Sequence, residues 1–204
     1  MKQFKRITCI ALSSLMLTSA VGCSKVGIGG KKIKKDDVQE AAEDALDAMI
    51  GLSAKKVKSF GDFDKGYAEL LDYISDDDTS TIVFKKASYE VDEDSIDVDK
   101  DEASIDVVIY IPDYEDAYYN SWDLDEFEDE IDDQKKKDYN EIEVTLEFEL
   151  DDDELVISNL DELFEEAFGD YFCFMTGYND LDKVVEAYTD YKSSDDDDDD
   201  DDED

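Results

Sequence analysis

Apolar residues near the start of the predicted domain recur at the three- and four-residue spacing of an α-helix. A first helix is predicted from Asp37, with Glu40 three residues later as its capping partner. Its apolar stripe comprises Val38, Ala41, Ala42, Ala45, Leu46, Met49 and Ile50, and beyond Gly51 it continues through Ala54, Val57 and Phe60. The same spacing predicts a second, short helix over residues 66–75.

Farther along the chain the period falls to two, which is typical of strands. Residues 80–91 alternate with a phase slip at Lys85 and Lys86, and we interpret them as a strand with a bulge or break. Residues 103–111 predict a clearer strand, in which Ile105, Val107, Ile109 and Ile111 face one way while Val108 and Tyr110 lie opposite.

A second clear strand, over residues 141–150, alternates apolar residues with four glutamates and a threonine. One side of this strand therefore faces the core and the other, strongly acidic side faces water, which is the pattern of an antiparallel sheet. Residues 151–153 are all Asp and would turn the chain into a returning strand over 154–158.

Two further helices are predicted, one over residues 123–134, capped by Asp123 with Glu126, and one over 180–191. Helices segregated from an antiparallel sheet predict an α+β fold, with the N-terminal helices packed on a curved sheet. We assign this domain to residues 36–192. The order of its elements resembles that of NTF2-like and cystatin-like domains, and the resemblance implies a concave pocket on the sheet.

A targeting signal is expected at the beginning of the chain. Lys2, Lys5 and Arg6 precede a mostly apolar run without acidic residues over 7–22. As a helix this run would be about 24 Å long, which is shorter than the ~30 Å hydrocarbon core of a bilayer. Residues 1–22 are therefore typical of a secretory signal peptide.

The end of this segment, Ala20-Val21-Gly22-Cys23, resembles the lipobox of bacterial lipoproteins. The resemblance implies that Cys23 carries the lipid, becomes the first mature residue and anchors the protein to the extracytoplasmic face of the membrane. The alternative is an ordinary signal peptide followed by a chance Cys. Residues 23–35 are rich in Gly and Lys and are expected to form a basic tether, which is either attracted to anionic headgroups or a plain linker.

The charge of the chain restricts its partners. It holds 61 acidic and 20 basic residues, a net charge of −41, and no His. Nucleic acid is excluded as a partner because phosphate binding needs clustered Lys and Arg, and imidazole catalysis is excluded outright. Residues 193–204 are nearly all Asp and predict a disordered acidic tail. A macromolecular partner should be a basic protein or peptide, beside the membrane that holds the lipid anchor.

Catalytic chemistry has no specific signal in the sequence. Carboxylate pairs suit glycosidases, but 61 acidic residues produce such pairs by chance. Cys173 lies in an apolar run, where we expect a buried, inert thiol rather than a nucleophile. No residue is nominated as catalytic, and no cofactor is expected apart from calcium held with low affinity.

Calcium is suggested by alternating carboxylates at Asp97, Asp99 and Asp101, which are similar to the start of an EF-hand loop. Glu102 replaces the glycine that such a loop requires, and Val108 replaces the final glutamate. The alternative interpretation is a solvated hairpin turn.

Aromatic residues gather between the two clear strands, at Tyr114, Tyr118, Tyr119 and Trp122. Pro112 should end the preceding strand and place these residues on a connecting loop. Exposed Tyr and Trp offer contact area for peptides or sugars at small entropic cost. The alternative is a satellite core under the loop.

Taken together, these patterns predict an exported, lipid-anchored protein that carries one acidic α+β domain. Its expected role is to bind, at the cell surface, a partner that is cationic or tolerates strong negative charge. The second hypothesis is a calcium-binding or ion-buffering protein, because its high negative charge calls for counterions. The third hypothesis is that the protein is an enzyme.

Overall fold

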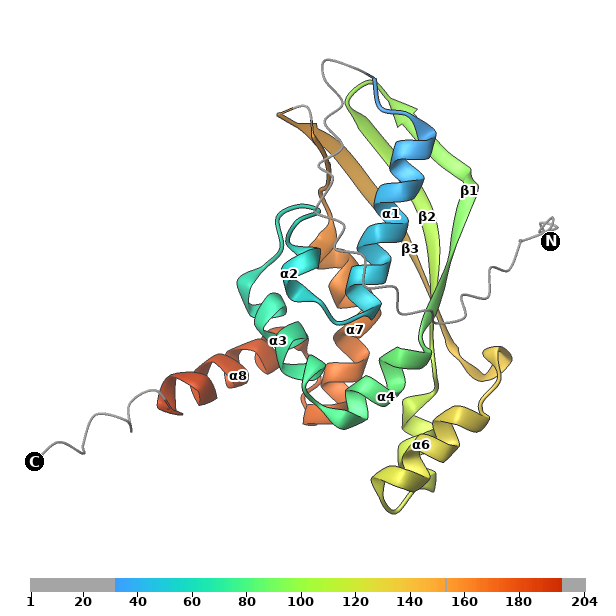
Figure 1. Ribbon diagram of the computed structural model, residues 1–204. Coiled ribbons are helices and arrows are strands. Elements are labelled where there is room, and N and C mark those ends of the chain that lie inside the picture. The colour runs from blue at the N-terminus through green and yellow to red at the C-terminus, as the bar shows by residue number, and fades with distance from the viewer. Residues whose placement is uncertain (1–31, 153, 196–204) are drawn as a thin grey trace, which may run out of the picture.

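One antiparallel sheet and a layer of helices make up the part of the chain that the computed structural model describes, residues 32–152 and 154–195 (Figure 1). The strands are β1 (Ser88–Asp99), β2 (Glu102–Ile111), β3 (Asn140–Asp151) and β4 (Glu154–Ile157), in the order β1-β2-β3-β4. Every pair is antiparallel. The predicted α+β class is therefore confirmed. The expected signal peptide, Cys23 and nearly all of the acidic tail lie outside the described residues.

Helices precede, interrupt and follow the sheet. Their bounds are α1 (Lys35–Ile50), α2 (Ala54–Val57), α3 (Lys65–Ser75), α4 (Asp78–Lys86), α5 (Tyr114–Asn120), α6 (Leu124–Asp133), the 3-10 helix η1 (Lys136–Asp138), α7 (Leu160–Thr176) and α8 (Leu181–Asp195). Helix α1 packs on β1 and β2, while α7 packs on β3, so both cover the same apolar face of the sheet.

The core lies between this face and the helices. On β2 and β3 the inward residues are Ala103, Ile105, Val107, Ile109, Ile111, Val144, Leu146 and Phe148, all of them buried. The alternation predicted for these two strands is confirmed, and so is the hairpin from β3 to β4. Asp152 adopts a φ of 48° in the turn of that hairpin, a left-handed conformation that lets the chain reverse tightly.

The first helices follow their predicted stripes but differ in their caps. Helix α1 begins two residues before Asp37, at Lys35, and no side chain caps it. Asp37 instead lies in the first helical turn, where a carboxylate interacts favourably with the helix dipole. Ile33, which the sequence placed in the tether, is 5% exposed and belongs to the core. Helix α3 confirms the second predicted helix.

The strand predicted over residues 80–91 is wrong in its first half. Residues 78–86 form helix α4, and only the residues after Ala87 join β1. Asp77 caps α4 by accepting a hydrogen bond from the Ser80 amide at 2.7 Å. The buried residues Ser80, Val83 and Phe84 have helical spacing. Burial of this face outweighs the strand preference of the β-branched residues.

Helix α7 is the longest helix among the described residues and lies in a stretch where no element was predicted from the sequence. Its buried residues, Leu160, Leu163, Phe164, Ala167, Phe168, Tyr171 and Phe172, recur every three or four positions. Burying each large apolar side chain stabilises the fold by about 1.5–3 kcal/mol. Helix α7 is therefore a central element of the core rather than an accessory.

The two remaining predicted helices are confirmed as α6 and α8. Helix α6 is capped as expected, because the Asp123 side chain accepts a hydrogen bond from the Glu126 amide at 3.0 Å. Helix α8 extends to Asp195, past the predicted end of the domain at residue 192. The residues after Pro112, expected to form a loop, instead form the short helix α5.

Candidate functional site

An exposed aromatic surface lies on α5, α6 and the link between them. We call Tyr118, Tyr119, Trp122 and Leu124 the aromatic tip. Trp122 is 94% exposed, Tyr119 75% and Tyr118 52%. Large aromatic side chains with this exposure are unusual on a surface so rich in charge, and they are the residue types that contribute most at protein interfaces.

The helices that carry the tip are held firmly. The Asp113 amide donates to Gln134 Oε1 at 2.8 Å, and Gln134 Nε2 donates back to the Asp113 carbonyl at 2.9 Å. This reciprocal pair joins the start of α5 to the end of α6. Lys86 of α4 pairs with Asp132 of α6 at 2.8 Å, and this hydrogen bond raises the pKa of Lys86. The tip therefore rests on a braced pair of helices.

The four aromatic residues singled out in the sequence do not share one environment. Tyr114 is 6% exposed and packs edge-on against Tyr171, with ring centroids 5.0 Å apart. Burial raises its pKa, and Asp170 adds to the shift. Tyr118 and Tyr119 contact Phe174 of α7, with centroids 5.4 and 6.0 Å away. Tyr114 therefore belongs to the core, whereas Tyr118, Tyr119 and Trp122 are exposed.

Phe174 packs against Tyr118 and Tyr119 of the aromatic tip, and it was not among the candidate residues predicted from the sequence. It lies in the apolar run beside Cys173, which is half-buried rather than fully buried. Burial and the nearby Asp170 and Asp180 raise the pKa of the Cys173 thiol. A raised pKa keeps the thiol protonated at neutral pH, and this agrees with an inert cysteine.

Carboxylates surround a shallow hollow at the base of the tip. It has a volume of about 380 Å³ and is lined by Asp113, Asp116, Glu130, Asp133, Gln134 and Asp138. The pKa of Asp138 is lowered by hydrogen bonds from the Lys137 side chain and the Lys135 amide. The surroundings of the aromatic tip are therefore anionic.

A second acidic surface covers the face of the sheet opposite α1 and α7. We call it the acidic sheet face and define it by five cross-strand rows of β1, β2 and β3. The rows are Ser88–Tyr110–Glu141, Glu90–Val108–Glu143, Asp92–Asp106–Thr145, Asp97–Ser104–Glu147 and Asp99–Glu102–Glu149. Ten of these fifteen positions are acidic and none is basic, and in two rows like charges stand directly opposite one another, at Asp92–Asp106 and at Asp99–Glu102–Glu149.

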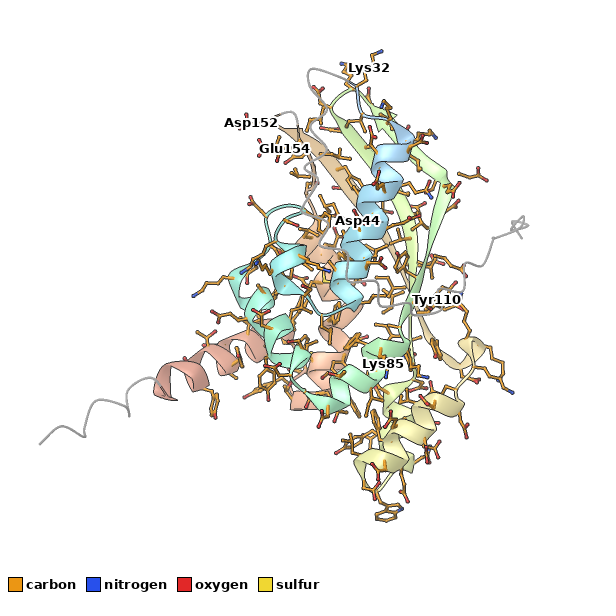
Figure 2. All side chains as sticks on the ribbon, viewed as in Figure 1. Lys32, Asp44, Lys85, Tyr110, Asp152 and Glu154 are labelled. Carbon is orange, nitrogen blue, oxygen red and sulfur yellow. The ribbon has the colours of Figure 1, made fainter. Side chains whose placement is uncertain are left out.

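A lysine from outside the strands contacts one end of this face. Lys136 Nζ lies 3.8 Å from the centroid of the Tyr110 ring and forms an ion pair with Glu90. The Tyr110 hydroxyl donates to Glu90 Oε2 at 3.2 Å. Tyr110 lies near the end of the strands, whereas Lys32 marks the opposite end (Figure 2).

The calcium candidates lie at that opposite end. Asp97 and Asp99 are exposed on β1, and Asp101 follows them in the hairpin turn to β2. The Asp101 carbonyl accepts a hydrogen bond from the Leu150 amide at 3.0 Å. Two of the three are thus strand residues rather than parts of one loop. Within the described part of the chain, no three or more acidic, Cys or His side chains are grouped to hold a metal ion.

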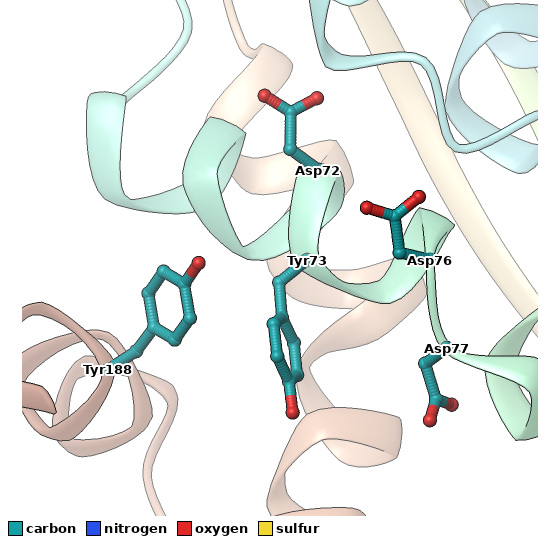
Figure 3. Close-up of a pocket in the computed structure, with 5 residues that line it drawn as sticks. All are labelled: Asp72, Tyr73, Asp76, Asp77 and Tyr188. Atoms are coloured by element: carbon teal, nitrogen blue, oxygen red, sulfur yellow. The ribbon is translucent and has the colours of Figure 1, made fainter. Parts of the chain in front are cut away.

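Another hollow, of about 450 Å³, lies between α3 and α8 (Figure 3). Tyr73 and Tyr188 contact each other there, with ring centroids 5.2 Å apart. Asp72, Asp76 and Asp77 complete the lining. Asp77 is already engaged as the cap of α4, where its side chain accepts from Ser80.

The chain matches no protein-family model, no curated protein and no solved structure. Among the residues described, none of the helices has the length and apolar character needed to cross a bilayer.

Proposed function

We propose that this chain is an exported bacterial lipoprotein that binds a cationic protein or peptide through its aromatic tip. The observation that carries the proposal is the exposure of Tyr118, Tyr119 and Trp122 on braced helices amid carboxylates. Aromatic side chains supply contact area, and the surrounding negative charge favours a basic partner and speeds its association. The binding is expected to weaken as salt is added.

The position of the tip supports a role away from the membrane. Lys35, at the start of α1, hydrogen-bonds the Ile96 carbonyl near the β1–β2 hairpin. The tip follows β2 at the other end of the sheet (Figure 1). Ten residues of β2 at ~3.4 Å each separate the two ends by roughly 30 Å. A chain held through Cys23 would thus present the tip outward.

The lipid anchor has its own test. We propose that Cys23 is lipidated and that the basic stretch between Cys23 and the buried Ile33 forms the tether. The lipobox-like Ala20-Val21-Gly22-Cys23 supports this proposal. Expression in a bacterial host should place the protein in the membrane fraction, and Cys23→Ser should release it or leave its signal uncleaved. Membrane association that Cys23→Ser leaves unchanged would exclude this anchor.

We further propose that the domain belongs with NTF2-like or cystatin-like folds. What supports this is α1 lying across a curved sheet whose strands follow sequence order. Members of these families bind small ligands, peptides or partners in the concave sheet, and some are enzymes. An experimental structure that aligned with neither fold would remove this assignment.

Trp122 provides a direct test of the tip because it is the only tryptophan in the chain. A short amphipathic peptide of Lys and Leu should shift its emission to the blue and bind less tightly in added salt. The Glu and Leu counterpart should not bind. Tyr119→Ala should weaken binding, whereas Tyr73→Ala, at a tyrosine that is 57% exposed on α3, should not. Unchanged Trp122 emission with the bound basic peptide would contradict the proposal.

A second candidate function is the binding or buffering of divalent cations. The acidic sheet face favours it, because rows such as Asp99–Glu102–Glu149 lack internal neutralisation. Thermal unfolding should then be followed with calcium, magnesium and sodium at matched ionic strength. A saturating stabilisation specific to calcium would indicate a defined site, to be sought first at Asp97, Asp99 and Asp101. Equal stabilisation by all three salts would mean charge screening alone.

A further inference from the structure

The contact of Lys136 with the acidic sheet face combines two kinds of attraction at one point. Its ammonium lies over the ring of Tyr110, 3.8 Å from the centroid, and also pairs with Glu90. A ring face and a carboxylate together are the groups that recognise an organic cation. The structure therefore contains an ammonium bound on this face, contributed by the chain itself.

The groups that receive the ammonium are more deeply buried than the lysine that supplies it. Tyr110 is 8% exposed, and its hydroxyl is fixed by its bond to Glu90, whose side chain is 18% exposed. The Lys136 side chain is 48% exposed and comes from η1, a single turn between α6 and β3. A preformed receptor with a partly solvated occupant is suited to exchange.

We propose that Tyr110 and Glu90 form an ammonium-binding subsite, which Lys136 fills in the free protein and a lysine of a basic peptide takes over by displacing it. No covalent bond changes in this exchange. The subsite rests on the proposed function in one respect, the positive charge of the partner, and it does not depend on the aromatic tip.

The rows beyond the subsite indicate why a peptide would compete well. Glu143 and Glu90 flank Val108 in the next row, and Asp106 stands opposite Asp92 in the row after it. Alternate residues of a strand are about 6.8 Å apart, and an extended peptide repeats its side chains at the same distance. Several lysines of one peptide can thus meet successive rows, whereas Lys136 contacts only Tyr110 and Glu90, in the first two rows.

The displacement can be observed on Lys136 itself. In the full chain, held in neutral detergent micelles, lysines would be labelled by reductive methylation with carbon-13, which preserves their charge. The signal missing from Lys136→Arg identifies Lys136, and the Tyr110 ring should shift it from the other lysines. Added pentalysine should move this signal to the position of solvated lysines, and sodium chloride of equal ionic strength should move it much less.

Two results of this titration would overturn the subsite. One is pentalysine that binds, as seen by changes elsewhere, while the Lys136 signal stays in place. The other is the absence of pentalysine binding even at low ionic strength. Folding of each sample is checked by circular dichroism, so that an unfolded variant is not mistaken for either result.

Affinity measurements with matched variants provide an independent check. Lys136→Gln removes the internal competitor, while Lys137→Gln removes the same charge from a lysine that pairs with Asp138 instead. If Lys136 fills the subsite two-thirds of the time, its removal raises pentalysine affinity about threefold over Lys137→Gln. Glu90→Gln should lower the affinity. Equal affinities for Lys136→Gln and Lys137→Gln would contradict the exchange.

Measuring the emission of Trp122 in the same titration distinguishes the test of the subsite from the test of the aromatic tip. Displacement of Lys136 without any change at Trp122 would retain the subsite and remove the tip as a contact. A change at Trp122 with Lys136 in place would do the reverse.

Discussion

At the scale of single residues, the hydroxyl of Tyr171 joins two helices through a buried chain of hydrogen bonds. Tyr171 is 1% exposed, and its hydroxyl lies 2.7 Å from Ser80 Oγ. Ser80 Oγ in turn donates to Asp77 Oδ2 at 2.7 Å, so the Tyr171 hydroxyl must be the donor to Ser80. The cap of α4 is thereby tied to α7.

Tyr171→Phe is expected to destabilise the fold by about 1 kcal/mol. The change removes the donor and leaves the buried Ser80 oxygen with an unmet acceptor. Urea unfolding measures the loss, with Tyr119→Phe as a control at an exposed position. Equal stability of the two variants would mean that the chain of hydrogen bonds contributes nothing.

The stability of the fold is expected to fall in alkali, because the Tyr171 hydroxyl is buried. Burial raises the pKa of Tyr171 above its ordinary value of 10.0, with Asp77 adding to the shift. The folded state thus keeps a proton that the unfolded state releases above pH 10, and stability decreases as pH rises from there. Unfolding free energies measured from pH 9 upward should decline less steeply in Tyr171→Phe. Identical slopes would show that Tyr171 does not take part.

At the scale of elements, the sequence predicted the regular pieces and missed those that depend on burial. The strand at 141–150 alternates cleanly because one side of it faces water, and the strand at 103–111 has a regular inward face although Tyr110 on its other side is also buried. Helix α7 was missed although its apolar stripe is regular, because it also carries aromatic residues such as Phe174 off the buried stripe. In α4 the β-branched residues suggested a strand, and the helix is fixed by contacts distant in sequence.

Glu102→Gln is expected to stabilise the protein by a few tenths to about 1 kcal/mol. Glu102 stands directly between Asp99 and Glu149, and like charges in this arrangement are destabilising. Asp36→Asn removes the same charge from the first turn of α1, where a carboxylate is favourable, and should not stabilise. Thermal unfolding distinguishes the two. Equal gains would mean that only the total charge matters.

At the scale of the whole molecule, the large negative charge affects both the stability of the fold and the kind of partner it can bind. The net charge of −41 follows from the sequence, which also pointed to Tyr118, Tyr119 and Trp122 of the aromatic tip but not to Leu124. The sequence could not place Tyr114 in the core, because that depends on Tyr171 and on a helix that the sequence did not assign. Nor could it bring Lys136 to Tyr110, because that contact requires the register of β2 and the path of the chain after α6.

Lowering the ionic strength is expected to destabilise the fold. The Debye length grows from about 8 Å at 0.15 M to about 30 Å at 0.01 M, so repulsion spreads across the molecule. The unfolding midpoint should therefore fall by several degrees between these conditions, for a shift of about 1 kcal/mol. An unchanged midpoint would mean that the carboxylates are already neutralised, for instance by bound ions.

The start of α1 and the aromatic tip lie at opposite ends of the sheet. This arrangement has a mechanical consequence. A partner that pulled on the tip of an anchored molecule would load the strands along their length. The tip joins the end of β2 to the start of β3, so a pull on it would load these two strands together. Helix α1 packs on β1 and β2, and the load would therefore act as shear across the whole interface between α1 and the sheet. The same protein pulled across its strands would unzip at much lower force.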